Sequence, residues 1–115
     1  MVPLLYRVAT ELLGWETVTY AHGKMQGLLN GSCIVGSPWD LVGYALKEAR
    51  RRGWSIELTH GQKSQDPNYF MLMFSRGDIR KQDTDQEMGS GLDQEPVIAI
   101  LRAIMSLYDS LEEKK

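Results

Sequence analysis

SPWDLVGYALKEARRRGWSIEL, residues Ser37 to Leu58, is the stretch that decides the fold. Ser37 stands at the expected N-cap of a helix, and Pro38 follows at the first helical position, where a missing N–H costs little. Gly53 stands where a left-handed residue ends a helix, and Trp54 supplies the hydrophobic contact of that ending. The stretch therefore predicts a capped helix that stops at a glycine and leads into a strand.

Inside this helix, apolar and charged side chains fall on opposite sides. At about 100° per residue, one arc holds the apolar residues Trp39, Leu41, Val42, Ala45, Leu46 and Ala49. The other side carries Tyr44, Lys47, Glu48 and Arg51. From Trp54 onward the pattern alternates residue by residue, which is typical of a half-buried strand.

Length and composition favour one globular domain spanning residues 1–115. Hydrophobic residues make up 43% of the chain and charged residues 24%, which are ordinary values for such a domain. The net charge of −2 gives no overall attraction to nucleic acid or to an anionic membrane. Cys33 is the single cysteine, and there is no long apolar run and no basic leader. These features predict a cytoplasmic protein without membrane contact.

The first half of the chain uses the same helix ending twice. A first helix is expected at 3–13, followed by Gly14 and Trp15, and then by a β-prone run at 16–20. The glycine-rich segment 21–36 is open in assignment, apart from a short strand at 32–35. The pair Gly53–Trp54 repeats the chemistry of Gly14–Trp15, so we interpret it as a recurring cap and not as a sequence repeat.

The second half predicts one strand, one long loop and one helix. Residues 68–75 are apolar on both faces, so this strand should be central and covered on both sides, or on one side with a partner on the other. A polar and acidic stretch at about 76–94 indicates a mobile loop. A final helix should begin near Asp93 and Pro96, with a solvated tail at 112–115. The expected fold is α+β: a small antiparallel sheet, built on 54–60 and 68–75, packed with about three helices.

Four local patterns together resemble the phage ABA sandwich domain family. They are the opening helix Leu5–Trp15 with its pattern Val-Ala-x-x-x-x-Gly-Trp, the helix Asp40–Trp54 with its ending Arg-x-x-Gly-Trp, the aromatic strand 69–74 and the closing helix 93–108. The resemblance covers nearly the whole chain, with departures at the cap 37–40 and in an extension at 82–92. It implies a compact α+β sandwich encoded by a phage or mobile element, and it brings no catalytic residues with it.

Two candidate sites lie at the two ends of the Ser37 helix. The basic cluster of Arg50, Arg51, Arg52 and Lys47 is explained by the helix dipole and solvation, or else it binds phosphates or an acidic partner. The helix start at Gly36 and Ser37 offers free amides to a small phosphorylated ligand. The preceding glycines match neither the Walker pattern nor the dinucleotide fingerprint, so a turn-rich connection is the other interpretation.

Acidic residues and scattered metal-binding side chains give weaker signals. Asp83, Asp85 and Glu87 form a solvated loop, or else they mimic nucleic acid toward a partner or hold a cation. His22, His60 and Cys33 lie far apart in sequence, without the close-spaced pair typical of zinc sites or a motif for a nucleophile. We therefore expect no metal, no cofactor and no enzyme activity.

The leading functional hypothesis is a non-enzymatic phage or prophage accessory protein in the host bacterial cytoplasm. It would bind a host protein or ribonucleoprotein, for instance to inhibit a bacterial immune nuclease, as an anti-CRISPR protein does. One alternative is a binder that sequesters a nucleotide-type signal. A further alternative is a nucleic-acid-binding module that uses Arg50–Arg52.

Overall fold

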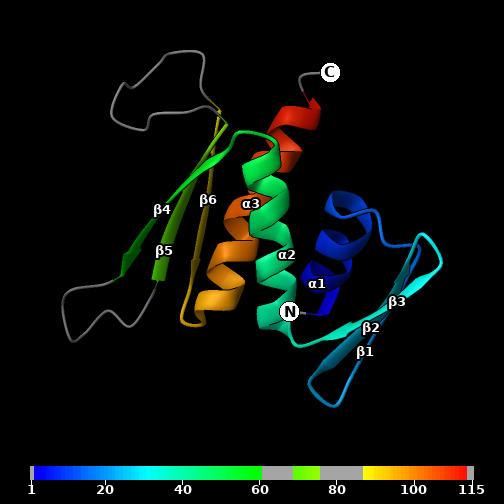
Figure 1. Ribbon diagram of the computed structural model, residues 1–115. Coiled ribbons are helices and arrows are strands. Elements are labelled where there is room, and N and C mark those ends of the chain that lie inside the picture. The colour runs from blue at the N-terminus through cyan, green and yellow to red at the C-terminus, as the bar shows by residue number, and fades with distance from the viewer. Residues whose placement is uncertain (1, 61–68, 76–86, 114–115) are drawn as a thin grey trace.

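A computed structural model describes residues 2–60, 69–75 and 87–113, and it has the predicted α+β fold (Figure 1). The helices lie between two small antiparallel sheets. In chain order the elements are α1 Val2–Arg7, the π-helical continuation η1 Val8–Leu12, β1 Thr17–Ala21, β2 Lys24–Leu29, β3 Ser32–Gly36, α2 Pro38–Arg51, β4 Ser55–His60, β5 Tyr69–Phe74, β6 Met88–Asp93 and α3 Pro96–Glu113. No helix in these ranges is long and apolar enough to cross a membrane.

The strands form two sheets, ordered β1-β2-β3 and β4-β5-β6, where the sequence predicted one. β5 lies between β4 and β6, so the prediction of a central strand is confirmed. Its Met71 and Met73 are buried, but Phe70 on the opposite face is 39% exposed. Leu72 and Phe74 on that face are half-buried, so in the part of the chain that the structure describes the second face of this strand is only partly covered.

Two tight turns organise the glycine-rich segment that the sequence left open. His22–Gly23 joins β1 to β2, and Asn30–Gly31 joins β2 to β3. All four residues have positive φ, from 52° to 79°. This is the conformation of a type I′ hairpin turn, which asparagine and glycine adopt readily. Residues 17–36 therefore form a three-stranded meander in place of a turn-rich connection.

α2 begins and ends as predicted. The Ser37 side chain accepts the N–H of Asp40 at 3.3 Å, and the Asp40 carboxylate accepts the N–H of Ser37 at 2.8 Å. At the other end, Gly53 has φ +81° and its N–H bonds to Arg50 O at 3.0 Å. The Trp54 N–H bonds to Ala49 O at 2.9 Å, which completes the Schellman ending.

The first helix ends on the same glycine–tryptophan pair, with a wider turn. Gly14 has φ +74°, but the N–H of Trp15 reaches back six residues to Ala9 O at 2.9 Å. The extra residue is accommodated by the π-helical segment η1. The recurring glycine–tryptophan cap is therefore confirmed, but the sequence did not predict the wider, π-helical turn at the end of the first helix.

β6 packs directly on α3, in a region that the sequence assigned to a mobile loop. Residues 88–93 are a strand, so that part of the predicted loop is wrong, and residues 76–86 lie outside the described ranges. Gly89 and Gly91 face the helix so closely that a Cβ on either would approach backbone atoms of α3 within 2.3 Å. The missing side chains let strand and helix meet backbone to backbone.

A single hydrophobic core joins the three helices to both sheets. Its largest fully buried side chains are Leu5, Val8, Met25, Leu41, Met73, Leu101, Ile104 and Leu107. Trp39, which the helical pattern placed in the apolar arc, is 56% exposed. α2 therefore buries its stripe from Leu41 onward and leaves its first turn outside the core.

Candidate functional site

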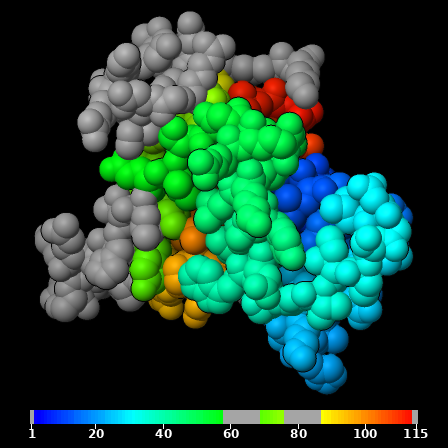
Figure 2. All heavy atoms as spheres, viewed as in Figure 1, coloured from blue at the N-terminus to red at the C-terminus, as the bar shows by residue number. Residues whose placement is uncertain are grey.

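The outer face of α2 carries an unusual combination of exposed aromatic and basic side chains. Trp39 is 56% exposed and Tyr44 is 41% exposed. In Figure 2, α2 crosses the middle of the visible face, beside the strands of the first sheet. We define the α2 surface as the exposed aromatic and basic residues of this face together with Gly43, namely Trp39, Gly43, Tyr44, Lys47, Arg50 and Arg51. The exposed carboxylate of Asp40 lies among them.

Two shallow hollows adjoin this surface. The first, the Trp15 groove, lies between α2 and the first sheet and has a volume of about 290 Å³; it is lined by Leu13, Trp15, Leu29, Ile34, Tyr44, Lys47, Glu48 and Arg51. The second, about 260 Å³, lies on α2 itself and is lined by Trp39, Asp40, Gly43, Tyr44 and Lys47. Tyr44 and Lys47 line both hollows, so the two form one continuous surface.

Aromatic packing fixes the wall between the hollows. The ring of Tyr44 lies edge-on to the buried ring of Trp15, with centroids 6.2 Å apart and an interplanar angle of 71°. Trp15 in turn lies against Gly27 of β2, where a Cβ would come within 2.5 Å of the indole ring. This packing holds Tyr44 in place on the side that contacts Trp15, while the other side of Tyr44 faces solvent.

The three arginines at the end of α2 have different surroundings. Glu48 accepts hydrogen bonds from Arg51 Nη2 at 2.6 Å and from Arg52 Nε at 2.8 Å. The Arg52 guanidinium also lies over the rings of Trp54, 5.3 Å away, and Tyr108, 5.6 Å away. Arg52 therefore ties the end of α2 to α3. For Arg50 and Lys47, the described part of the chain provides no side-chain hydrogen bond or ion pair.

The ion pairs give Glu48 an acid-sensitive role in stability. The hydrogen bond from Arg51, together with that from Arg52, lowers the pKa of Glu48 from 4.5 to about 2. Because this pKa is depressed in the folded state, the stabilisation is complete above about pH 5 and is lost as the pH falls toward 2. Glu48→Gln should reduce the free energy of unfolding by about 1 kcal/mol at pH 7.

Urea unfolding between pH 7 and pH 2.5 checks this expectation. The difference between wild type and Glu48→Gln should shrink steadily below pH 5. Glu57→Gln on β4 is the control, because this exposed carboxylate has no hydrogen bond in the described chain; its effect should stay within about 0.5 kcal/mol. A Glu48→Gln difference that is constant over the whole pH range would contradict the assigned role.

The predicted anion site at the start of α2 is occupied by the helix's own cap. The Asp40 carboxylate accepts hydrogen bonds from the Ser37 N–H and hydroxyl. A Cβ on Gly36 would lie 2.8 Å from that carboxylate. An anion bound there would have to displace a negative charge. The basic cluster lies at the opposite end of the helix, about 21 Å away for 14 residues, so these two predicted sites are separate.

The acidic residues and the metal-binding side chains do not form a site in the described chain. Asp83 and Asp85 lie outside the described residues. The Glu87 carboxylate accepts the Ser110 hydroxyl at 2.7 Å, so this side chain fastens the start of β6 to α3. Within the described ranges, no three His, Cys, Asp or Glu side chains come close enough to hold a metal ion. Cys33 is exposed, and Gln26 Nε2 lies 3.6 Å from its sulfur.

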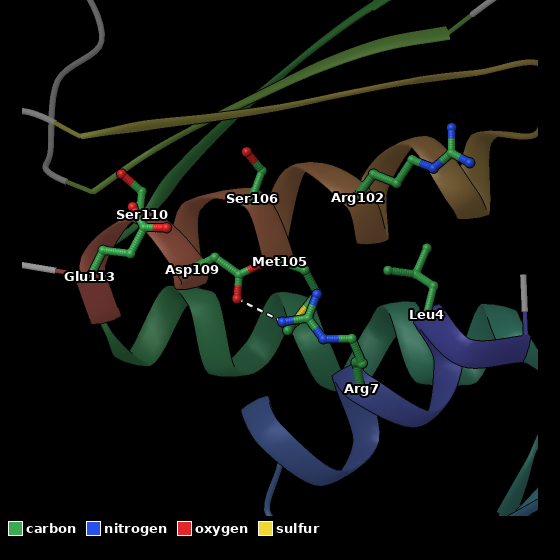
Figure 3. A pocket seen from close by; sticks show the side chains of 8 residues that line it. All are labelled: Leu4, Arg7, Arg102, Met105, Ser106, Asp109, Ser110 and Glu113. Carbon is green, nitrogen blue, oxygen red and sulfur yellow. Dashed lines mark hydrogen bonds and ion pairs between the residues drawn. The ribbon is translucent and has the colours of Figure 1, made fainter.

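A third hollow, about 410 Å³, lies between α1 and α3 (Figure 3). Arg7 crosses it and donates to Asp109 at 2.7 Å, and its Nε donates to Glu11, also at 2.7 Å. The bonds to Glu11 and Asp109 raise the pKa of Arg7 above its ordinary value. A guanidinium that already holds two carboxylates has little capacity for another anion. We interpret this hollow as a charged seam that ties the first helix to the last.

Sequence reasoning missed the aromatic part of the α2 surface. The helical pattern did place Tyr44 among Lys47, Glu48 and Arg51, and an aromatic side chain on a charged face is a signal for an interaction surface. Trp39 gave no comparable signal. The pattern cannot tell where the core stops covering a helix.

These features describe a small α+β protein whose most distinctive exposed feature is an aromatic and basic helix face. No family model matches the chain, and no curated protein does. Its fold is similar to that of a solved phage protein from Bacillus cereus ATCC 14579, with a TM-score of 0.53 and 13% sequence identity. The match covers 90% of this chain and 87% of that one. At this identity the likeness concerns the fold alone, and both the phage origin and membership of the family stay predictions.

Proposed function

We propose that this chain is a non-enzymatic phage accessory protein that acts by binding a host protein through the α2 surface. The observation that carries the proposal is the exposure of Trp39 and Tyr44, at 56% and 41%, beside Lys47 and Arg50. Tryptophan, tyrosine and arginine are enriched among the few residues that dominate the binding energy at protein interfaces. Burying these rings against a partner would remove a large apolar area from water.

The state of the cations favours a protein partner over nucleic acid. Sequence-independent DNA binding depends on several lysine or arginine side chains that each neutralise a phosphate. In this cluster, Glu48 neutralises part of the charge of Arg51 and Arg52, and Arg52 is stacked on two aromatic rings. Lys47 and Arg50 remain as cations without a side-chain partner in the described chain. Two such cations suit the charged rim of a protein interface better than a backbone-tracking groove.

The geometry around α2 also disfavours a nucleotide as the ligand of the α2 surface. The start of α2 carries the carboxylate of Asp40 where a phosphate would sit. The hollows beside α2, at about 290 and 260 Å³, fall just below the range of about 300–1,000 Å³ usual for small-molecule sites. Side-chain anchors of a protein partner fit such hollows.

The biological role that we propose is inhibition of a host defence protein in the bacterial cytoplasm. An inhibitor needs a binding surface and no catalytic groups. The fold of this chain is similar to that of a phage protein. A binding protein encoded by a phage is made inside the host cell, where it meets host proteins. A nuclease-based immune system is the target class that we favour.

Quantitative capture from host lysate tests the proposal. The tagged wild type is compared with Trp39→Ala/Tyr44→Ala and with a matched control, Met88→Ala/Leu92→Ala, which truncates two residues of similar exposure on the second sheet, 53% and 52%. We expect the first variant to bind the captured host protein at least about 10-fold more weakly than wild type. The control should bind like wild type, and circular dichroism should show all three folded.

Two results would overturn the proposal. One is a captured protein that depends on Met88 and Leu92 but not on Trp39 and Tyr44. The other is equally tight binding of the purified chain to protein-free host nucleic acid, lost in Trp39→Ala/Tyr44→Ala, because that result assigns the surface to nucleic acid.

A further inference from the structure

We infer that the Trp15 groove holds an acidic segment of the partner, which inserts one apolar side chain between α2 and the first sheet. This inference rests on the proposed function and names the chemistry of the segment that binds. It follows from the apolar floor of the groove, from the charge of its rim, and from its continuity with the second hollow.

The floor of the groove is apolar and open to solvent. Leu13, Leu29 and Ile34 are half-buried, and they surround the edge of Trp15. These side chains come from three separate elements of the chain, which leave a gap that no described residue fills. An apolar side chain placed there would complete the packing between α2 and the first sheet.

The rim of the groove is positive on one side and uncharged on the other. Lys47 and Arg51 project from α2, and Glu48, the one carboxylate among the lining residues, is hydrogen-bonded to Arg51 and Arg52. The opposite wall, from β2 and β3, contributes only the apolar Leu29 and Ile34. Because the whole chain has a net charge of −2, an acidic segment would be repelled elsewhere and attracted here.

The second hollow gives the segment a direction. Tyr44 and Lys47 line both hollows, so a chain that lies over Tyr44 reaches both. Asp40 adds a negative charge at the Trp39 end, whereas Lys47, Arg50 and Arg51 gather at the other end. The acidic residues of the segment should therefore lie near Lys47 and Arg50, the two cations without a side-chain partner in the described chain. A second apolar or neutral residue should lie beside Trp39.

A peptide selection tests this inference with the full chain. A phage-displayed random 12-residue library is selected against the immobilised protein, and enriched peptides are synthesised. We expect the enriched sequences to contain an apolar or aromatic residue flanked by Asp or Glu. Their affinity should fall at least 10-fold in Lys47→Glu and with rising salt. It should not change in Lys24→Glu, the same charge change at an exposed lysine of β2 outside the groove.

Tryptophan fluorescence locates the peptide. In a Trp39→Phe/Trp54→Phe background, Trp15 is the single tryptophan. Because phenylalanine keeps an aromatic ring at position 39, the peptide should still bind this background, more weakly than wild type, and binding should change the Trp15 emission. Ile34→Asp should remove both the binding and the emission change.

The inference is overturned if no peptide is enriched, if the enriched peptides lack acidic residues, or if Lys47→Glu binds them normally. Those outcomes leave the proposed function standing when host-protein capture still depends on Trp39 and Tyr44. When capture does not depend on those residues, the proposed function fails, whatever the peptides do.

Discussion

Gly91→Ala is expected to reduce the free energy of unfolding by about 3 kcal/mol or more, a large share of what a domain of this size has. A Cβ at this position would lie 2.2 Å from Ala99 O and 2.7 Å from Ala103 N, both backbone atoms of α3. The strand cannot move away without breaking its pairing with β5. It is also tied to the helix by Arg102, which donates to Leu92 O at 3.0 Å.

Urea unfolding of Gly91→Ala and of the control Gly43→Ala measures how much each substitution changes the free energy of unfolding. Gly43 lies in the middle of α2, and a Cβ there would meet nothing within 4 Å. Gly43→Ala should therefore raise stability by about 0.5–1 kcal/mol through helix propensity alone. A loss below 1 kcal/mol in Gly91→Ala would mean that β6 does not pack on α3 as described.

The ends of α2 could be predicted because their chemistry is local. The capping box of Ser37 and Asp40 and the Schellman ending at Gly53 each use backbone groups within a few residues. The same reasoning located the end of the first helix at Gly14. Where a local structure is determined by residues that are neighbours in sequence, the residue types and their spacing are sufficient to predict it.

Strand β6 could not be predicted in this way because its position depends on a distant helix. Glycine is depleted in strands, so Gly89 and Gly91 indicated a loop. Their spacing of two residues places both glycines on the same face of a strand, and this indicates a strand only when α3 is known to lie against that face. The Asn30–Gly31 turn is different: its signal is present in the sequence, since this pair is a strong indicator of a type I′ hairpin.

The candidate site also has a part that could be predicted from local sequence and a part that depends on the whole fold. The sequence predicted a basic cluster from the charges of Arg50–Arg52, but it could not predict which carboxylates and rings would engage them. Glu48 binds Arg51 and Arg52, and Trp54 stacks on Arg52. Lys47 and Arg50 are therefore the basic residues that we expect to contact a partner. Exposure of Trp39 follows from where the core ends, which is a property of the whole fold.

Gly27→Ala tests how far the candidate site depends on the sheet beneath it. The Cβ of alanine would come within 2.5 Å of both the Thr17 carbonyl oxygen and the Trp15 ring. Because Thr17 belongs to the paired strand β1, we expect the ring to move in preference to the strand. The free energy of unfolding should fall by about 2–3 kcal/mol. Tyr44, which packs edge-on against Trp15, should lose its support.

The displacement of Trp15 is measurable separately from the loss of stability. With Trp15 as the single tryptophan, in the Trp39→Phe/Trp54→Phe background, its burial at 6% exposure should give a blue-shifted emission. Gly27→Ala should shift that emission to the red and increase quenching by acrylamide under conditions where the variant is folded. Gln26→Ala, one residue away on the outer face, should change stability by less than about 0.5 kcal/mol and leave the emission unchanged. If Gly27→Ala left both the emission and the host-protein affinity intact, the groove would not depend on the Trp15 packing, and the α2 surface would act without the sheet.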